Sequence, residues 1–214
     1  MEKPQVIILL GGPASGKGTQ AKILAEDIGY KYFGTGDLLR GEAERGTELG
    51  KKFAKLMDVG ELVPDEFTDP LVLTKLNELK NLGVVLDGYP RNLEQAATLQ
   101  SVFPDENFLV LNIIVSEKSL LKRMSSRRIC DKCGKIITVK NDEKICDFCG
   151  GNFIQRVDDS PTILEKRIKT YNTRTAPIIA YYREQDKVKD IDGEPPIKEV
   201  TKEIQKAVKG KLTD

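Results

Sequence analysis

Short apolar runs alternate along the chain with segments whose apolar residues recur at helical spacing. Continuous apolar runs, typical of strands buried in a parallel sheet, lie at Gln5–Leu10, Val84–Asp87, Phe108–Val115 and, more weakly, Val188–Asp192. Helical spacing marks residues 19–29, 36–46, 65–81, 92–103, 117–127, 161–185 and 196–210. Asp65 and Asn92 suit the N-cap positions of two of these helices. The alternation predicts an α/β protein with three layers, in which helices cover both faces of a central parallel sheet.

One stretch, from about Ile129 to Val157, breaks this alternation and is rich in Gly, Lys, Asp and Cys. It holds all four cysteines of a chain that has no histidine. Cys130, Cys133, Cys146 and Cys149 form two CxxC pairs, a spacing typical of a zinc ribbon. Four thiolates leave no open coordination position, so we expect a structural metal, most simply Zn²⁺, with iron as the alternative.

Two other interpretations of the cysteines stay open. A redox CxxC motif would need only one pair and an activated thiolate. A nucleic-acid finger would need a basic face, and residues 127–156 carry seven Lys and Arg against four Asp and Glu. That modest excess favours a structural clip, in which the metal replaces a hydrophobic core that so small a segment cannot build.

Composition narrows the function classes. The 214 residues are 39% hydrophobic and 31% charged, which is ordinary for a globular protein. A net charge of only +1 argues against broad binding to nucleic acid or to acidic membranes. The apolar runs are shorter than the roughly 20 residues that span a bilayer, and the N-terminal run lacks the flanks of a signal peptide. We expect a cytoplasmic protein, in a reducing compartment that favours metal sites over disulfides.

A glycine-rich turn follows the first apolar run and leads into a helix. In this turn Gly11 and Gly16 frame four residues and Lys17 follows, which is the pattern of a P-loop. Its backbone N–H groups and the helix N-terminus favour phosphate, and the lysine reaches the β- and γ-phosphates. The expected ATP-binding residues here are Gly12, Pro13, Ala14, Ser15, Gly16, Lys17, Gly18 and Thr19.

The hydroxyl that usually binds magnesium in a P-loop is displaced in this sequence. Gly18 follows Lys17, and the hydroxyl arrives one residue later, at Thr19. Asp87, at the end of an apolar run, lies where an open α/β sheet presents residues to a ligand, although a strand-end carboxylate can also serve as a cap. We therefore expect the magnesium environment to include Thr19, Asp37 and Asp87.

Three further motifs accompany the P-loop: GTGDLLR at residues 34–40, LDGYPRNLEQA at 86–96 and RRIC…QRVDD at 127–159. In order and spacing, over nearly the whole chain, they resemble the adenylate kinase family, in the form whose long lid binds zinc. The resemblance implies a P-loop core at 1–33, 64–126 and 161–214. It also implies an inserted arm for the nucleoside monophosphate (NMP) at 34–63, and a zinc-ribbon-like lid at 127–160.

The resemblance also implies residue roles. Those for AMP fall on Thr35, Arg40, Val63, Gly88, Arg91, Gln95, Arg156 and Arg167. Arg123 and Arg127 match the ATP-facing arginines, and Asp158 and Asp159 match an acidic pair of the lid. The catalytic set would be Lys17, Arg91, Arg123, Arg156 and Arg167. Arginine suits this task because its planar fork donates two hydrogen bonds to one phosphate.

The expected activity is reversible transfer of a phosphoryl group from MgATP to AMP, giving two ADP, by a monomer without nucleic-acid or membrane partners. A kinase for UMP, CMP or another nucleoside monophosphate on the same scaffold is the nearest alternative. A P-loop protein that binds nucleic acid through its zinc ribbon is the more distant one. Two residues depart from the family pattern: Ala14 stands where glycine is common, and Gly34 where serine is common.

Overall fold

The structure, a computed structural model, describes residues 5–103, 108–138 and 143–212. Its centre is a five-stranded parallel sheet in the order β2-β3-β1-β4-β8. The strands are β1 (Val6–Gly11), β2 (Lys31–Gly34), β3 (Val84–Asp87), β4 (Phe108–Ile114) and β8 (Val188–Asp192). The four predicted strands are confirmed. Strand β2 was not predicted, because its sequence KYFG contains no continuous apolar run.

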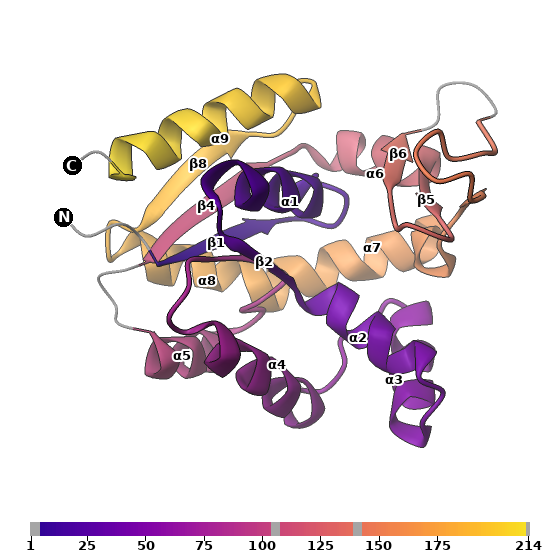
Figure 1. The fold of residues 1–214 in the computed structure, drawn as a ribbon, viewed down its shortest axis with the longest axis horizontal. Helices are drawn as coiled ribbons and strands as arrows, with labels where there is room; N and C mark the ends of the chain where they lie inside the picture. The colour runs from indigo at the N-terminus through magenta and orange to yellow at the C-terminus, as the bar shows by residue number, and fades with distance from the viewer. Residues whose placement is uncertain (1–4, 104–107, 139–142, 213–214) are drawn as a thin grey trace.

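Helices cover both faces of this sheet, as predicted (Figure 1). One face packs against α1 (Lys17–Ile28) and α9 (Ile197–Leu212), and the other against α4 (Asp65–Leu79), α5 (Leu93–Val102) and α8 (Ala176–Arg183). Two further helices, α6 (Glu117–Ser126) and α7 (Pro161–Thr170), share a smaller apolar cluster of their own. Successive side chains of β1 alternate between two cores. Ile7 and Leu9 pack against α1 and α9, whereas Ile8 and Leu10 face α4, α5 and α8. Because alternate side chains of this buried strand point to opposite faces, β1 contributes to the cores on both sides of the sheet.

A π-helical turn, η3 (Tyr171–Thr175), joins α7 to α8. The sequence predicted one helix over 161–185, and the chain does follow a nearly continuous helical path there. Single π-helical turns inside helices are frequent at functional sites, because they redirect the side chains that follow. Here the turn lies beside the cleft described below.

Two helices, α2 (Thr35–Glu44) and α3 (Glu48–Asp58), extend from the end of β2 (Figure 1). They share a small apolar core formed by Leu39, Phe53 and Val63. Asn92 caps α5, as predicted, by accepting a hydrogen bond from the Gln95 backbone. The predicted cap at Asp65 is wrong: Pro64 is the N-cap of α4, and the Asp65 carboxylate instead accepts hydrogen bonds from Asn92 and Gln95.

The stretch that breaks the alternation forms a separate small sheet. Its three antiparallel strands lie in the order β6-β5-β7 and comprise β5 (Arg127–Cys130), β6 (Ile136–Thr138) and β7 (Phe153–Ile154). A 3₁₀ turn, η2 (Val157–Asp159), leads back to α7. Part of the expected lid, residues 139–142, lies outside the described residues. Within the described ranges, every helix is too short or too polar to cross a membrane.

Candidate active site

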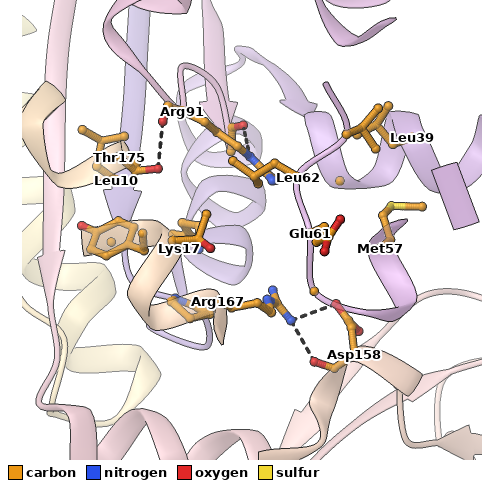
Figure 2. A pocket seen from close by; sticks show the side chains of 18 of the residues that line it. Leu10, Lys17, Leu39, Met57, Glu61, Leu62, Arg91, Asp158, Arg167 and Thr175 are labelled. Atoms are coloured by element: carbon orange, nitrogen blue, oxygen red, sulfur yellow. Dashed lines mark hydrogen bonds and ion pairs between the residues drawn. The ribbon is translucent and has the colours of Figure 1, made fainter. Parts of the chain in front are cut away.

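A cleft of about 930 Å³ opens at the carboxyl ends of β1 and β3 (Figure 2). Its walls come from the P-loop, from α2, α3 and the residues after α3, and from η2, α7 and η3. The site residues expected from the sequence that line it are Pro13, Lys17, Arg40, Val63, Gly88, Arg91, Arg156 and Arg167. Segments distant in the chain therefore bring one lysine and four arginines to a single cavity.

The P-loop adopts a tight turn before α1. The Ser15 N–H donates to the Gly12 carbonyl at 3.2 Å, and Lys17 Nζ donates to the same carbonyl at 3.1 Å. Gly16, the N-cap of α1, has φ 94°, a conformation that glycine adopts without strain. Ala14 has φ 63°, so the residue that replaces glycine occupies the left-handed region.

Burial changes the charge state available to Lys17. Desolvation lowers the pKa of Lys17 to about 8, an effect that nearby Asp87 opposes and Arg167 reinforces. A phosphate in the cleft would stabilise the ammonium form, because an opposite charge favours ionisation. The site is thus arranged so that an anion in the cleft would satisfy a poorly solvated cation.

Asp87 explains why residue 18 is glycine. A Cβ atom on Gly18 would lie 2.7 Å from Asp87 Oδ2, closer than real contacts allow. The other carboxylate oxygen, Oδ1, is buried with no hydrogen-bond partner in the described residues. A carboxylate oxygen left free beside a P-loop is the type of ligand that Mg²⁺ or its bound water prefers. The residues present therefore fit a magnesium ion.

The other two expected magnesium residues differ in position. Asp37 lies in the first turn of α2 and contacts Lys22, Tyr32 and Arg40. Burial would raise the pKa of Asp37, but Arg40 and Lys22 outweigh it and hold that pKa below its ordinary value. Thr19 is partly exposed on α1 and is not among the residues that line the cleft.

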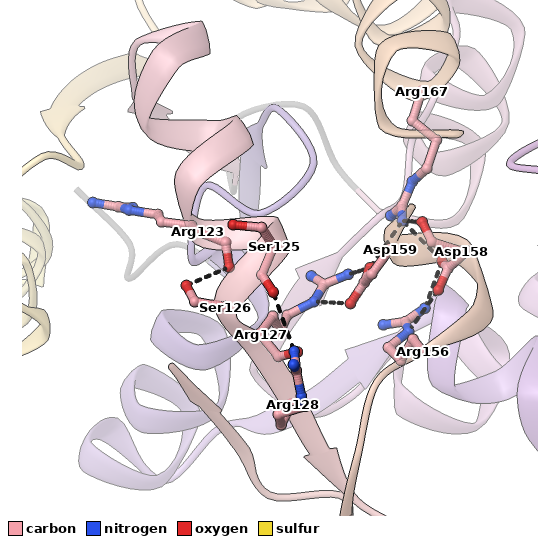
Figure 3. A network of polar contacts seen from close by, with 9 residues as sticks. All are labelled: Arg123, Ser125, Ser126, Arg127, Arg128, Arg156, Asp158, Asp159 and Arg167. Atoms are coloured by element: carbon pink, nitrogen blue, oxygen red, sulfur yellow. Dashed lines mark hydrogen bonds and ion pairs between the residues drawn. The ribbon is translucent and has the colours of Figure 1, made fainter. Parts of the chain in front are cut away.

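An acidic pair orients the arginines on the lid side (Figure 3). Arg156 donates from Nε and Nη2 to the two oxygens of Asp158, both at 2.9 Å, and Arg167 Nη1 donates to Asp158 Oδ2 at 2.8 Å. Burial lowers the pKa of Arg167 to about 10, while Asp158 acts against this. Asp158 would itself have a raised pKa through burial, but Arg167 and Arg156 outweigh that effect and lower it. The Asp158 carboxylate, which both guanidinium groups share, thus offsets the repulsion between Arg156 and Arg167.

Arg123 and Arg127, the expected ATP-facing arginines, lie outside the cleft lining. Arg123 donates to the backbone carbonyls of Ser15 at 3.2 Å and Gly193 at 2.6 Å, so it links the P-loop to the residues after β8. Arg127 forms a two-pronged ion pair with the buried carboxylate of Asp159 (Figure 3). In this structure both guanidinium groups are held by protein acceptors.

A second, smaller cavity of about 250 Å³ adjoins the cleft. It is lined by Thr35, Leu39, Leu62, Val63, Asp65, Thr68, Arg91 and Gln95. Four residues expected to hold AMP thus meet in one place, namely Thr35, Val63, Arg91 and Gln95. The Thr35 hydroxyl is buried without a partner in the described residues, so a polar ligand atom could satisfy it.

The orientation of the Gln95 amide is set by its protein partners. Its Oε1 accepts from the Arg91 N–H at 2.9 Å. Its Nε2 donates to Asp65 Oδ1 at 2.8 Å and to Asp69 Oδ1 at 3.1 Å. An N–H can only donate and an ionised carboxylate can only accept, so this pattern fixes which end of the amide is which.

The four cysteines converge, as their spacing predicted. Their Sγ atoms all lie within 4.8 Å of one another, with Cys130 and Cys149 3.4 Å apart and Cys133 and Cys146 3.7 Å apart. Each CxxC pair ends in a glycine of positive φ, 71° and 70°. Four convergent thiols match a closed tetrahedral site, so this cluster could hold a metal ion.

Comparison with known proteins agrees with this geometry. A family model described as adenylate kinase matches residues 9–187. An adenylate kinase of Petrotoga mobilis is 43% identical over 206 residues, covering 92% of this chain and 94% of its own. That of Caldicellulosiruptor saccharolyticus is 42% identical over 211 residues, covering 94% and 98%. The chain belongs to the adenylate kinase family. It is therefore a phosphotransferase, and the predicted fold class and reaction class are confirmed.

Several residues of this adenylate kinase cleft were not predicted from the sequence. Thr175 Oγ1 donates to the Arg91 carbonyl at 3.0 Å from the π-helical turn (Figure 2). Tyr171 lines the cleft from the same turn, and Met57 lines it from α3. Asp69 reaches Gln95 from the second turn of α4. None of these residues lies in a recognisable motif, and only the folded arrangement brings them to the site.

Proposed function

We propose that this protein transfers a phosphoryl group reversibly from MgATP to AMP, giving two ADP. The observation that carries the proposal is the cleft that unites Lys17 and the P-loop with Arg40, Arg91, Arg156 and Arg167. A smaller cavity that shares Val63 and Arg91 with the lining of this cleft has a polar amide at its wall. One basic chamber fits two nucleotides whose phosphates meet between the cations, with the acceptor base on the side of the smaller cavity.

The chain's own part in the reaction is alignment and charge dispersal. Phosphoryl transfer requires little covalent help, because the attacking phosphate oxygen of AMP is already ionised at neutral pH. Lys17 and the P-loop amides would hold the donor phosphates, and Arg91 would hold the acceptor phosphate. Arg156 and Arg167, which Asp158 orients, would stabilise the equatorial oxygens of the transferred group. No side chain needs to remove a proton.

Gln95 would select the acceptor base. Asp65 and Asp69 use both of its amide hydrogens, so the group that it retains for a ligand is the remaining lone pair of Oε1. That oxygen would accept a hydrogen bond from an exocyclic amino group, which adenine has and which guanine and uracil lack at the corresponding edge. The arrangement supports AMP over GMP and UMP.

Two metals have separate roles in this proposal. Magnesium, when bound with ATP, would neutralise phosphate charge, and Asp87 and Asp37, with Thr19 further out, would hold the ion or its waters. Zinc would be held by Cys130, Cys133, Cys146 and Cys149 as a structural ion. The donor sets match these preferences, since magnesium favours oxygen ligands and zinc favours thiolate sulfur.

We further propose a division into a core, an NMP-binding arm at 34–63 and a lid at 127–160. Closure of the arm and lid over the cleft would exclude water, which would otherwise accept the phosphoryl group. Lys166 on α7 forms an ion pair with Glu61 at 2.7 Å, and this contact lies on the boundary between arm and core. A monomeric state and a cytoplasmic location remain predictions.

An acceptor panel tests the proposal. Phosphoryl transfer from ATP is measured with AMP, CMP, UMP and GMP at equal concentrations, with and without Mg²⁺. We expect AMP to exceed GMP and UMP by roughly two orders of magnitude in kcat/KM, because a mismatched base leaves buried polar groups unpaired. The margin over CMP should be smaller, because cytosine also has an exocyclic amino group that can donate to Gln95 Oε1. Preference for CMP or UMP would instead support a pyrimidine monophosphate kinase, and no transfer to any acceptor would refute the proposal.

A further inference from the structure

Tyr32 connects two carboxylates of the proposed magnesium site. It lies on β2, and its phenol oxygen is 3.0 Å from Asp37 Oδ2 and 3.4 Å from Asp87 Oδ2. Asp37 belongs to the first turn of α2, whereas Asp87 ends β3. One hydroxyl therefore bridges the start of the proposed arm and the end of β3, the strand of the core sheet next to β2. Its proton can be shared between two acceptors that would otherwise repel each other.

Gly34 provides the space for this bridge. Tyr32 and Gly34 are two residues apart on one strand, so they share a face of the sheet. In the parallel register Gly34 lies opposite Asp87. A Cβ atom on Gly34 would be 2.8 Å from Tyr32 Cζ and nearer still to the phenol oxygen. The phenol thus occupies the volume that a serine side chain at this position would fill, which accounts for the departure from the family pattern.

The charges around the Tyr32 hydroxyl differ between its two carboxylate partners. Lys22 Nζ lies 3.2 Å from Asp37 Oδ2 and 5.0 Å from the centroid of the Tyr32 ring, and Arg40 pairs with Asp37 Oδ1. Asp87 has no such ion pair among the described residues; its Oδ2 contacts Tyr32, and its buried Oδ1 has no hydrogen-bond partner. The bridge therefore holds one oxygen of Asp87 and leaves the other for a ligand.

We propose that Tyr32 is a positioning residue for the magnesium-nucleotide site: its hydroxyl holds Asp37 and Asp87 in one arrangement, and Gly34 makes room for it. This inference rests on the proposed function. Groups that orient metal-binding side chains commonly change metal affinity by roughly 10–100-fold when they are removed. The Tyr32 phenol, which contacts both carboxylates of the proposed site, would orient them in the same way.

The test is the Tyr32→Phe variant, which removes only the hydroxyl. Calorimetry measures the affinity for ATP with excess Mg²⁺ and with EDTA, and the ratio of the two affinities reports the coupling of magnesium to nucleotide. We expect this ratio to fall roughly tenfold, with the affinity in EDTA unchanged. Tyr181→Phe is the matched control, because it removes a phenol that bonds to Gln100 at 2.7 Å. That variant should retain the wild-type ratio.

A second set of variants tests the role of Gly34. Gly34→Ala should displace the phenol and lower the same ratio, whereas Gly34→Ala added to Tyr32→Leu should cause no further loss, because no phenol remains to displace. An unchanged ratio in Tyr32→Phe would overturn the inference, and so would additive losses in the double variant. If the wild-type protein bound no ATP, the proposed function and this inference would both be rejected.

Discussion

The carboxylate of Asp87 occupies the space into which a side chain on residue 18 would project, with Oδ2 2.7 Å from the position of a Cβ atom. Gly18→Ala should therefore push Asp87 away from its present position and disturb the neighbouring Lys17. We expect kcat/KM to fall roughly tenfold or more, since small displacements of aligned groups are costly in catalysis.

The matched control for this change is Gly41→Ala on α2. No heavy atom lies within 4 Å of a Cβ atom at that position. Alanine should maintain full activity there and could stabilise the helix by up to about 1 kcal/mol. Steady-state kinetics compare kcat/KM of Gly18→Ala and Gly41→Ala with that of the wild-type protein. Equal activity of the two would show that the Asp87 carboxylate does not need its present place.

Much of this arrangement was predictable from the sequence, for identifiable reasons. Buried parallel strands such as β1 and β4 have sequences that are continuous apolar runs. The residue spacings of the P-loop and of the cysteine pairs are found in few other structures. Local patterns of this kind depend only on neighbours in the chain. The structure accordingly places Lys17 in the cleft and brings the four cysteines together in one cluster.

Other features depend on contacts between distant segments. Strand β2 is short and mixed in polarity, and its place at the sheet edge comes from its pairing with β3. Asp65 has the composition of a cap, yet Asn92 and Gln95 draw its carboxylate toward the second cavity. The hydrogen bonds of Arg123 with Gly193 and Glu194 likewise cross about seventy residues of sequence. No periodicity encodes such contacts.

The lowered pKa of Lys17 makes a prediction about stability. Below about pH 8 the folded and unfolded states both carry the charged lysine, and its burial destabilises the fold. Between about pH 8 and its ordinary pKa of 10.5, the folded state loses this proton while the unfolded state retains it. Stability contributed by this residue should therefore rise with pH in that window.

Lys17→Met provides the comparison for this pH effect. The difference in free energy of unfolding between the variant and the wild-type protein, measured by urea titration, should shrink by on the order of 1–3 kcal/mol from pH 7.5 to pH 10. Catalysis by the variant should fall by orders of magnitude at every pH. A difference in unfolding free energy that did not change with pH would show that Lys17 is not desolvated in the folded protein.

The cysteine cluster should stabilise the lid without taking part in the reaction. Replacing Cys130 and Cys133 by Ser should release the metal and lower the melting temperature, because so small a sheet has little hydrophobic core of its own. Activity well below the melting point should partly survive. Elemental analysis, calorimetry and kinetics test this, with Lys132→Ala in the same turn as the control. Complete loss of activity in a folded, cool sample would point to a direct role for the metal.

Gln95→Glu should reveal the two carboxylates that hold the amide. The variant places a third carboxylate against Asp65 and Asp69 where two donated hydrogen bonds existed. Buried like charges without partners cost on the order of 3–5 kcal/mol. The loss should be relieved as the pH falls and these groups bind protons, since their folded-state pKa values would be raised.

The control for this change is Gln100→Glu. Gln100 Oε1 accepts a hydrogen bond from the Tyr181 hydroxyl, and a carboxylate can accept the same bond. That variant should melt close to the wild-type temperature. If Gln95→Glu melted there as well at neutral pH, the proposed orientation of the Gln95 amide would be wrong.

The most direct measurement is a crystal structure with a bisubstrate analogue, in which two adenosines are joined through a chain of phosphates. We predict one adenine in the small cavity beside Gln95 and Val63, with the phosphate chain between Lys17 and the guanidinium groups of Arg156 and Arg167. A cleft that stayed vacant, or an analogue bound with those cations directed elsewhere, would contradict the account.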